Sequence, residues 1–461
     1  MFLSAQPCTR SAFSLSLGGL WGSRSDLGWA VDVLRHGLCG ECSLGTHGWR
    51  DALLPGVRVC SAGMAGLRRW TAGGLDLALL EDVSALSELS SPALRGLGRL
   101  PEPVLWRSGQ AGFTPLSWDD AIKLVATRVA ETSGGWTLSY NSAELSNEAM
   151  FCFAELARSG RAGHVTSGLS EAQREGAAWL RGNFGAQEAT ASLEDLLEAD
   201  TVVVAACDLR AEPLLLDYLA QVGRSGGQVV EIGPGQIESG GKPGNLADRN
   251  TMAGRTVLLV GPAIAAAPAE PADALWSAAR SMLEAADPAP LFIPVGWPPG
   301  YRAACDLGLS TEDSQGGAEP VEEPIPMWFA AGNSVGQPPS AAKFRVHQIF
   351  DLDPSVLLPA DEAVLLLPMQ SRFEISGGGT YTSMVGRVRF SPEIRGHQIG
   401  VARPDWWAAS HVLAHIEGST CAHEDGDALR RSLAQLRPAY AGTADLFAAG
   451  EGFVVSPPGA V

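Results

Sequence analysis

Two hydrophobic patterns alternate along most of the chain. Short uninterrupted apolar runs, such as "TVVVAAC" in 201–207 and "AVLLLP" in 363–368, are typical of strands that are buried on both faces. Between such runs lie longer segments with apolar residues every three or four positions. In 117–132, for example, Ser117 is a suitable N-cap and Asp119 and Asp120 suit a first helical turn. The pattern therefore predicts strands that alternate with helices.

The order of these elements is that of parallel β-α-β units. The pattern predicts strands at 136–141, 200–207, 228–234, 255–261, 290–296, 325–333, 343–351 and 362–368. It predicts helices at 117–132, 146–160, 191–199, 212–226 and 272–286. Strands that are joined through helices pair in parallel, so we expect an α/β fold with two doubly wound parallel-sheet domains.

The loops that follow the predicted strands are the expected ligand-binding positions. Ligands of doubly wound sheets bind at the carboxyl ends of the strands, and glycine lets the backbone approach an anion closely. The loops of this kind are 206–213, 232–236, 330–339 and 376–383. None has the spacing of a Walker loop or of GxGxxG, so each taken alone reads as an ordinary loop.

Composition narrows the class of protein. Hydrophobic residues make up 46% of the 461 residues and charged residues 18%, which is enough apolar material for large cores. The net charge of −18 argues against a nucleic-acid partner, because such a partner requires a basic face. No apolar run approaches the roughly 20 residues that span a bilayer. We expect a cytoplasmic chain whose first 30 residues are an extension rather than a signal peptide.

Three of the eight cysteines have the spacing Cys39-x2-Cys42-x17-Cys60. In a reducing compartment, cysteines that are close in sequence are more often metal ligands or redox groups than structural disulfides. The sequence therefore predicts a metal site at these three residues, with buried free thiols as the alternative.

Taken in order, several segments resemble the molybdopterin oxidoreductase family. This family includes formate dehydrogenase alpha subunits, whose branch the chain resembles most, and the large subunit of respiratory complex I. The resemblance runs from about residue 33 to the C-terminus, where the chain is truncated relative to the family. The similar segments are 33–60, 104–126 ("VLWRSGQAGFTPLSWDDAIKLVA"), 146–160, 200–219, 330–339 and 361–394.

The resemblance implies two cofactors and a redox activity. A [4Fe–4S] cluster would be bound by Cys39, Cys42 and Cys60. A molybdopterin guanine dinucleotide would lie along the four loops, with contacts from Asp208, Gly233, Gly332, Asn333, Gly378 and Thr380. The activity implied is two-electron oxidation of a small, formate-like substrate, with electrons passed to the cluster and on to partner redox subunits.

The resemblance also implies a discontinuous domain layout. An N-terminal extension (1–30) precedes a small iron–sulfur-type cysteine region (31–66). Residues 67–171 together with 319–420 form one α/β domain, and 172–318 form a second that is inserted in it. Residues 421–461 form a tail that leads toward a β-barrel absent from this sequence.

The chain departs from the family at two ligand positions. The family's usual third cysteine, four residues after Cys42, is Thr46 here, which leaves His47 and Asp51 as possible fourth ligands. A site with only three ligands, a zinc site of the Cys3His type and no metal at all also stay open. The position of the molybdenum ligand is occupied by Ala172, next to Ser170. A non-catalytic scaffold or electron-transfer subunit without molybdenum is therefore the alternative to a catalytic subunit.

Overall fold

A computed structural model describes most of the chain. The described residues are 27–58, 60–232, 254–265, 291–309, 325–333, 335, 342–418, 423 and 425–455. Most of the expected N-terminal extension, the helix predicted at 272–286 and the predicted cofactor residue Gly233 lie outside them.

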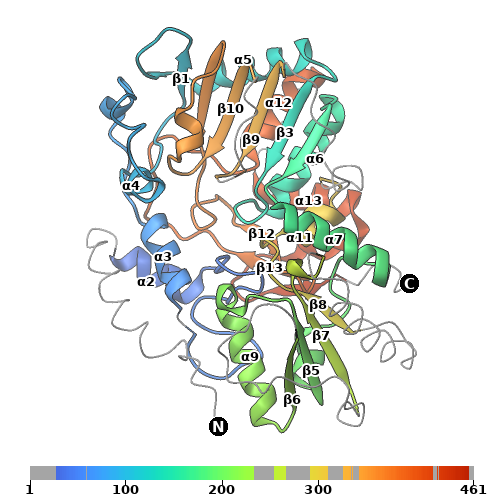
Figure 1. The fold of residues 1–461 in the computed structure, drawn as a ribbon. Helices are drawn as coiled ribbons and strands as arrows, with labels where there is room; N and C mark the ends of the chain where they lie inside the picture. Colours follow the sequence, from blue (N-terminus) through green and yellow to red (C-terminus); the bar gives the residue numbers. More distant parts are fainter. Residues whose placement is uncertain are drawn as a thin grey trace.

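The larger sheet has seven strands in the order β2-β1-β11-β10-β9-β3-β4, and it lies at the top of Figure 1. Its strands are β1 (Val104–Arg107), β2 (Thr114–Pro115), β3 (Trp136–Tyr140), β4 (His164–Ser167), β9 (Met327–Ala331), β10 (Phe344–Ile349) and β11 (Ala363–Pro368). The five strands from β11 to β4 are parallel, whereas β1 runs antiparallel to both of its neighbours.

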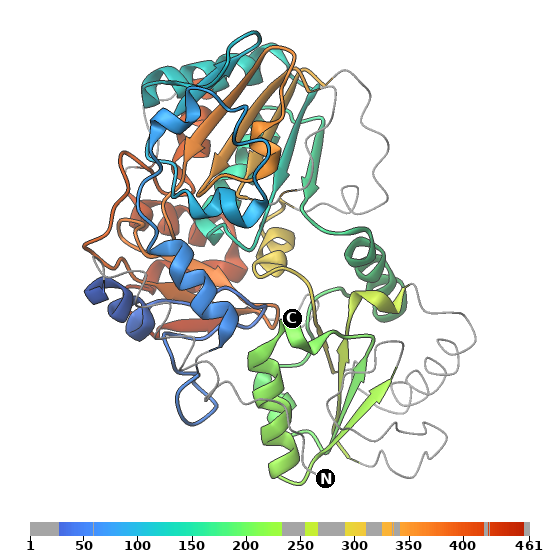
Figure 2. The same cartoon turned by 60° about the vertical axis from the view of Figure 1, so that its left-hand side comes forward.

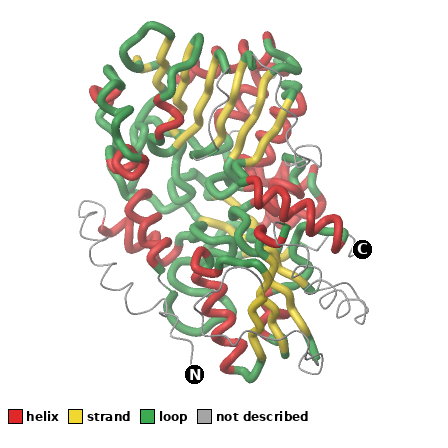
Figure 3. The backbone as a smooth tube through the Cα atoms, in the orientation of Figure 1, coloured by secondary structure: helices red, strands yellow, loops and turns green. Residues whose placement is uncertain are grey.

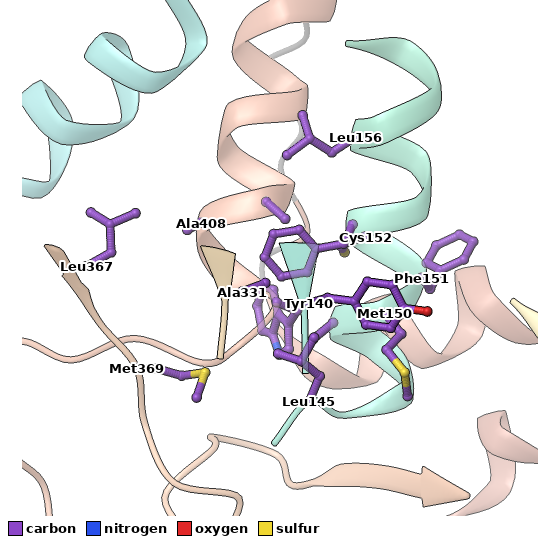
Figure 4. Close-up of a cluster of buried hydrophobic side chains, with 14 of the residues drawn as sticks. Tyr140, Leu145, Met150, Phe151, Cys152, Leu156, Ala331, Leu367, Met369 and Ala408 are labelled. Atoms are coloured by element: carbon purple, nitrogen blue, oxygen red, sulfur yellow. The ribbon is translucent and has the colours of Figure 1, made fainter. Parts of the chain in front are cut away.

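Both faces of this sheet are covered. One face packs against α5 (Trp118–Glu131), α6 (Asn147–Ser159) and α12 (Trp407–Glu417). Figure 4 shows part of this core, in which Tyr140 of β3 and Ala331 of β9 meet Met150 and Cys152 of α6. The other face is covered by loops and by the short helices η2 (Leu77–Leu80), α4 (Ser91–Gly96) and η6 (Pro354–Leu357).

The smaller sheet has four parallel strands in the order β6-β5-β7-β8. They are β5 (Thr201–Ala205), β6 (Gln228–Ile232), β7 (Thr256–Val260) and β8 (Phe292–Pro294). Val202 and Val204 pack toward α8 (Leu193–Leu197) and α9 (Pro213–Arg224), whereas Val203 and Ala205 pack toward α7 (Glu171–Phe184) and η5 (Pro262–Ile264). All four strands lie between β4 and β9 in the sequence. The predicted α/β fold, with two parallel sheets and one inserted in the other, is confirmed.

A third, antiparallel sheet was not predicted from the sequence. Its strands are β12 (Gly379–Thr382), β13 (Arg387–Ser391) and β14 (Gly452–Val454). In the C-terminal segment, β14 follows α13 (Gly426–Leu436) and η7 (Pro438–Asp445), and α13 packs against α6. Residues 426–454 are therefore built into the body of the fold.

The two parallel sheets lie at opposite ends of the molecule (Figures 1 and 2). Between them lie the antiparallel sheet, α11 (Tyr301–Asp306) and the N-terminal helices α2 (Leu27–His36) and α3 (Ser61–Trp70). Loops make up much of this middle region (Figure 3). Among the described residues, no helix has both the length and the apolar character needed to cross a bilayer.

Asp405 is a buried residue that links the segment before α12 to the start of α6. Its carboxylate accepts hydrogen bonds from the backbone N–H of Ser146, at 2.6 Å, and from the Ser146 hydroxyl, at 3.0 Å. Burial raises the pKa of Asp405 to about 7 in spite of these bonds. The carboxyl group therefore takes up a proton on folding at pH values between its ordinary pKa and 7.

We expect the Asp405→Asn variant to gain stability relative to the wild type as pH rises. The unfolded pKa is near 3.9, so the folded chain holds the extra proton between about pH 4 and pH 7. The wild-type free energy of unfolding therefore falls across this window, by up to about 1.4 kcal/mol for each unit of pH. Thermal unfolding at pH 5 and pH 8 should show the midpoint of the variant rising by several degrees relative to that of the wild type.

The exposed Asp445 provides the control, because Asp445→Asn makes the same chemical change at the surface. Only a pH-dependent shift of the midpoint beyond that of this control is assigned to Asp405. A difference for Asp405→Asn that is the same at pH 5 and pH 8 would show that the buried carboxyl group does not titrate in this range.

Candidate functional site

The three predicted metal ligands line one cavity, which we call the cysteine cavity. Cys39 and Cys42 lie in the loop after α2, and Cys60 is the N-cap residue of α3. The volume of the cavity is about 60 Å³, whereas a single water needs roughly 10–15 Å³ by the same kind of measure. Apolar side chains form much of its wall, among them Leu67, Trp70 and Phe373. The cavity is large enough for a group much bigger than one metal ion.

The backbone donates hydrogen bonds to two of the sulfur atoms. The N–H of Gly45 lies 3.4 Å from Cys42 Sγ, and the N–H of Gly63, in the first turn of α3, lies 3.3 Å from Cys60 Sγ. Such N–H groups stabilise thiolates and tune bound clusters. Burial, followed by the charge of Glu41, raises the pKa of Cys39 to about 11. Metal binding would therefore release protons from these thiols.

The position at which the resembled family has its third cysteine also faces the cavity. Thr46 lies on the wall, where its hydroxyl donates to Gly48 O at 2.7 Å. His47 and Asp51 are absent from the lining. The ring nitrogens of His47 are buried without a hydrogen-bond partner, and burial lowers its pKa to about 4. The Asp51 carboxylate accepts from the backbone N–H groups of residues 53 and 54 and from the hydroxyl of Tyr218.

Within the described part of the chain, no three His, Cys, Asp or Glu side chains converge closely enough to hold a metal ion. The three thiols are instead spread around a cavity. This arrangement does not favour a zinc site, in which four ligands surround one ion at about 2.0–2.3 Å.

A second cavity, which we call the polar cavity, adjoins the first. Its volume is about 170 Å³, and its lining includes Gly40, Glu41, Arg69, Glu144 and Arg372. The loop from Cys39 to Cys42 separates the two cavities, because its cysteines face one and its two central residues face the other. This volume is below the roughly 300–1,000 Å³ of pockets that hold drug-sized ligands.

Acidic side chains balance the arginines of the polar cavity. Arg69 donates to Asp351 at 2.5 and 3.1 Å, to Glu144 at 2.6 Å and to the Asn333 side chain at 3.1 Å. Burial raises the pKa of Glu41, and the charge of Arg372 opposes this shift. The guanidinium of Arg69 is therefore already bonded to protein groups and does not offer a free site to a phosphate.

Two of the predicted pterin contacts lie against residues that line the polar cavity. Gly332 has φ of 89°, and a Cβ there would lie 3.3 Å from the Asn141 side chain and 3.4 Å from that of Glu144. Asn333 follows β9, and its backbone N–H donates to Glu144 at 2.7 Å. These contacts place the loop after β9 against the wall of this cavity.

The other predicted pterin contacts in the described residues lie elsewhere. Asp208 is exposed at the end of β5, where it pairs with Arg210 at 2.8 Å. Thr380 is fully buried, and its N–H and hydroxyl bond to Glu148 of α6 at 3.0 Å. The carbonyl group of Gly378 accepts from Arg430 at 3.2 Å. In this structure, these residues contact protein groups rather than either cavity.

The position expected for a molybdenum ligand lies at the start of α7. Ala172 is the second residue of that helix and lines neither cavity. Ser170 is the N-cap residue, and its hydroxyl accepts from Gln173 N at 3.3 Å in a capping box. Neither side chain is therefore aimed at the two cavities.

Two charged residues at these cavities were not found from the sequence. Arg372 lines the polar cavity, donates to Ala143 O at 2.8 Å and stacks over the ring of Tyr381. Asp217 of α9 lines the cysteine cavity from the inserted domain. Both lie in segments that resemble the family, 361–394 and 200–219, but each is far in sequence from the cysteine region, so spacing alone does not indicate that it meets the cysteines.

Comparison with known proteins gives limited similarity. No family model matches the chain. Uncharacterized oxidoreductases of Mycobacterium bovis and Mycobacterium tuberculosis are 27% identical to it over 154 residues, which are 33% of this chain. The chain matches about a fifth of the length of these relatives (20%). This similarity supports a general relationship to oxidoreductases.

A solved structure also resembles part of the fold. It is the formyltransferase/hydrolase complex (FhcABCD) from Methylorubrum extorquens in complex with methylofuran. The match has a TM-score of 0.45 and 11% sequence identity, and it covers 68% of this chain and 99% of the matched chain.

Proposed function

We propose that this chain is a subunit of a molybdopterin-type oxidoreductase complex that binds an iron–sulfur cluster without carrying the molybdenum chemistry. The observation that carries the proposal is that Cys39, Cys42 and Cys60 line one cavity larger than a single ion. The similarity to mycobacterial proteins named as oxidoreductases supports the class of activity.

The residues of the cysteine cavity fit such a cluster. Its thiolates would bind iron, while the N–H groups of Gly45 and Gly63 stabilise the negative charge on the sulfurs. Trp70 and Phe373 form apolar parts of the wall. When bound, a [4Fe–4S] cluster supplies one-electron transfer. Partner redox subunits would deliver and receive the electrons.

A second candidate is a catalytic subunit that oxidises a small, formate-like substrate at a pterin-bound molybdenum. The polar cavity beside the cysteine loop is the observation in its favour. Against it stand the position of Ala172, the engagement of Arg69 by carboxylates and the small volume of the cavity. Arg372 would place a positive charge in the polar cavity.

Iron analysis of protein purified without oxygen tests the first proposal. The wild type should hold iron and acid-labile sulfide, and Cys42→Ser should lose most of both because it removes a thiolate ligand. The control is Cys305→Ser, since Cys305 lies outside the cysteine cavity and bonds to Gln187. Equal iron in the Cys42 and Cys305 variants would contradict the proposal.

The same preparations separate the two candidate functions. Molybdenum and pterin that copurify in amounts close to one per chain would favour the catalytic candidate. Iron without either would support the electron-transfer subunit.

A further inference from the structure

The cysteine cavity supplies three thiols, whereas a [4Fe–4S] cluster takes four protein ligands. Besides the cysteines, the lining offers side chains with polar or sulfur atoms from Thr46, Met64, Arg58, Asp217, Trp49 and Trp70. The indole N–H of each tryptophan is a donor only. A guanidinium has no acceptor, and the hydroxyl of Thr46 already bonds to Gly48. A thioether is a soft, neutral ligand that suits copper(I) better than a cluster iron. The carboxylate of Asp217 is the anionic oxygen ligand on this wall.

Asp217 reaches the cavity from the inserted domain. It lies on α9, one turn after Leu214, which lines the same wall. Its side chain is 17% exposed and pairs with Arg58, whose Nε lies 3.4 Å from Asp217 Oδ2. A carboxylate has about four lone-pair sites on two oxygens, so it can bind a metal ion while it is also paired with an arginine.

We propose that Asp217 is the fourth protein ligand of the cluster and binds the iron that the three cysteines leave open. This inference rests on the proposed function, because it presupposes that the cavity holds iron. It differs from the sequence-based candidates, His47 and Asp51, neither of which lines the cavity. The ligand set of three thiolates and one carboxylate would join the cysteine region to the inserted domain through the bound cluster.

One iron of such a cluster is held more weakly than the other three, because an oxygen ligand replaces a thiolate. Oxidation with ferricyanide then removes one electron and one Fe²⁺ from [4Fe–4S]²⁺. It leaves [3Fe–4S]⁺, with ferricyanide reduced to ferrocyanide. The [3Fe–4S]⁺ product is paramagnetic and the starting cluster is not, so electron paramagnetic resonance reports the change directly.

The test compares the full-length wild type with Asp217→Ala after anaerobic reconstitution with iron and sulfide. The wild type should bind about four irons per chain, and the variant about three as [3Fe–4S]⁰. One-electron oxidation of the variant by ferricyanide should then give the [3Fe–4S]⁺ signal with no further release of iron. Adding Thr46→Cys to Asp217→Ala should restore about four irons, because residue 46 also faces the cavity. Asp217→Cys should keep about four and lose iron to ferricyanide more slowly than the wild type does.

Two matched variants separate ligation from the ion pair. Arg58→Ala removes the salt bridge but leaves the carboxylate, so it should retain about four irons. His47→Ala should do the same, because His47 does not line the cavity. Four stable irons in Asp217→Ala, or loss of one iron in His47→Ala instead, would overturn the assignment while leaving the cluster proposal intact. A wild type that binds no iron after reconstitution would overturn both.

Discussion

Replacing Arg99 by leucine should destabilise the folded chain by about 3–5 kcal/mol. Arg99 and Glu374 form a bidentate ion pair at 3.0 and 2.5 Å, and each side chain is only 1% exposed. The guanidinium also donates to the carbonyl oxygen of Trp70 at 3.2 Å and stacks over Phe350. Its loss would leave the Glu374 carboxylate buried without a countercharge. The thermal midpoint should fall by roughly 10 °C.

Two further variants identify the cause of this loss. Adding Glu374→Gln to Arg99→Leu should recover part of the stability, because no uncompensated charge is then buried and the amide oxygen can still accept from Ser371 N. Arg158→Leu is the exposed comparison, since Arg158 pairs with Glu155 on the surface and should change stability by less than about 1 kcal/mol. If the double variant were no more stable than Arg99→Leu alone, lost packing rather than the buried charge would explain the effect.

The parallel sheets were predictable from the sequence because burial of both strand faces leaves a local signature. The run at 201–207 is apolar throughout, and β5 is buried at every position. Helix N-caps also depend on residues that are close in sequence. Ser117 and Ser146 accept hydrogen bonds from residues three positions later, as N-cap residues do.

The antiparallel sheet was not predictable in the same way. Its strands are only three to five residues long, and β14 alternates between exposed and half-buried positions. β14 pairs with β13, which lies more than sixty residues earlier in the chain, and α12 and α13 lie between the two strands in the sequence. Pairing over such a separation depends on the whole fold rather than on a local pattern.

The candidate site was predicted only in part, because local spacing identifies residues that are close in sequence but not those that distant segments contribute. Spacing placed Cys39, Cys42 and Cys60 in one group, and the structure brings them to one cavity. Proximity in sequence also suggested Asp51, but its carboxylate caps the following turn. Asp217 lies in the helix predicted at 212–226. Contact between the domains determines which face of that helix meets the cysteine region. Periodicity within one helix cannot show such a contact.

Replacing Gly45 by alanine should reduce iron retention by roughly 10- to 100-fold, the range seen when groups that support metal ligands are altered. Gly45 has φ of 62°, and its N–H donates to Cys42 Sγ. A Cβ at this position would overlap the carbonyl oxygen of Cys39, which is backbone and cannot rotate away. The loop that carries two of the three thiols must therefore shift.

Gly56 provides a matched control in the same region. Its φ is 95°, so alanine there meets the same kind of backbone strain, but no atom lies within 4 Å of the added Cβ. Iron per chain after reconstitution should therefore fall much further in Gly45→Ala than in Gly56→Ala. The thermal midpoint of the iron-free proteins gives a second readout, because the overlap with Cys39 exists without a cluster. Equal losses in the two variants would mean that backbone strain alone, and not the fit of residue 45 against Cys39, governs the loop.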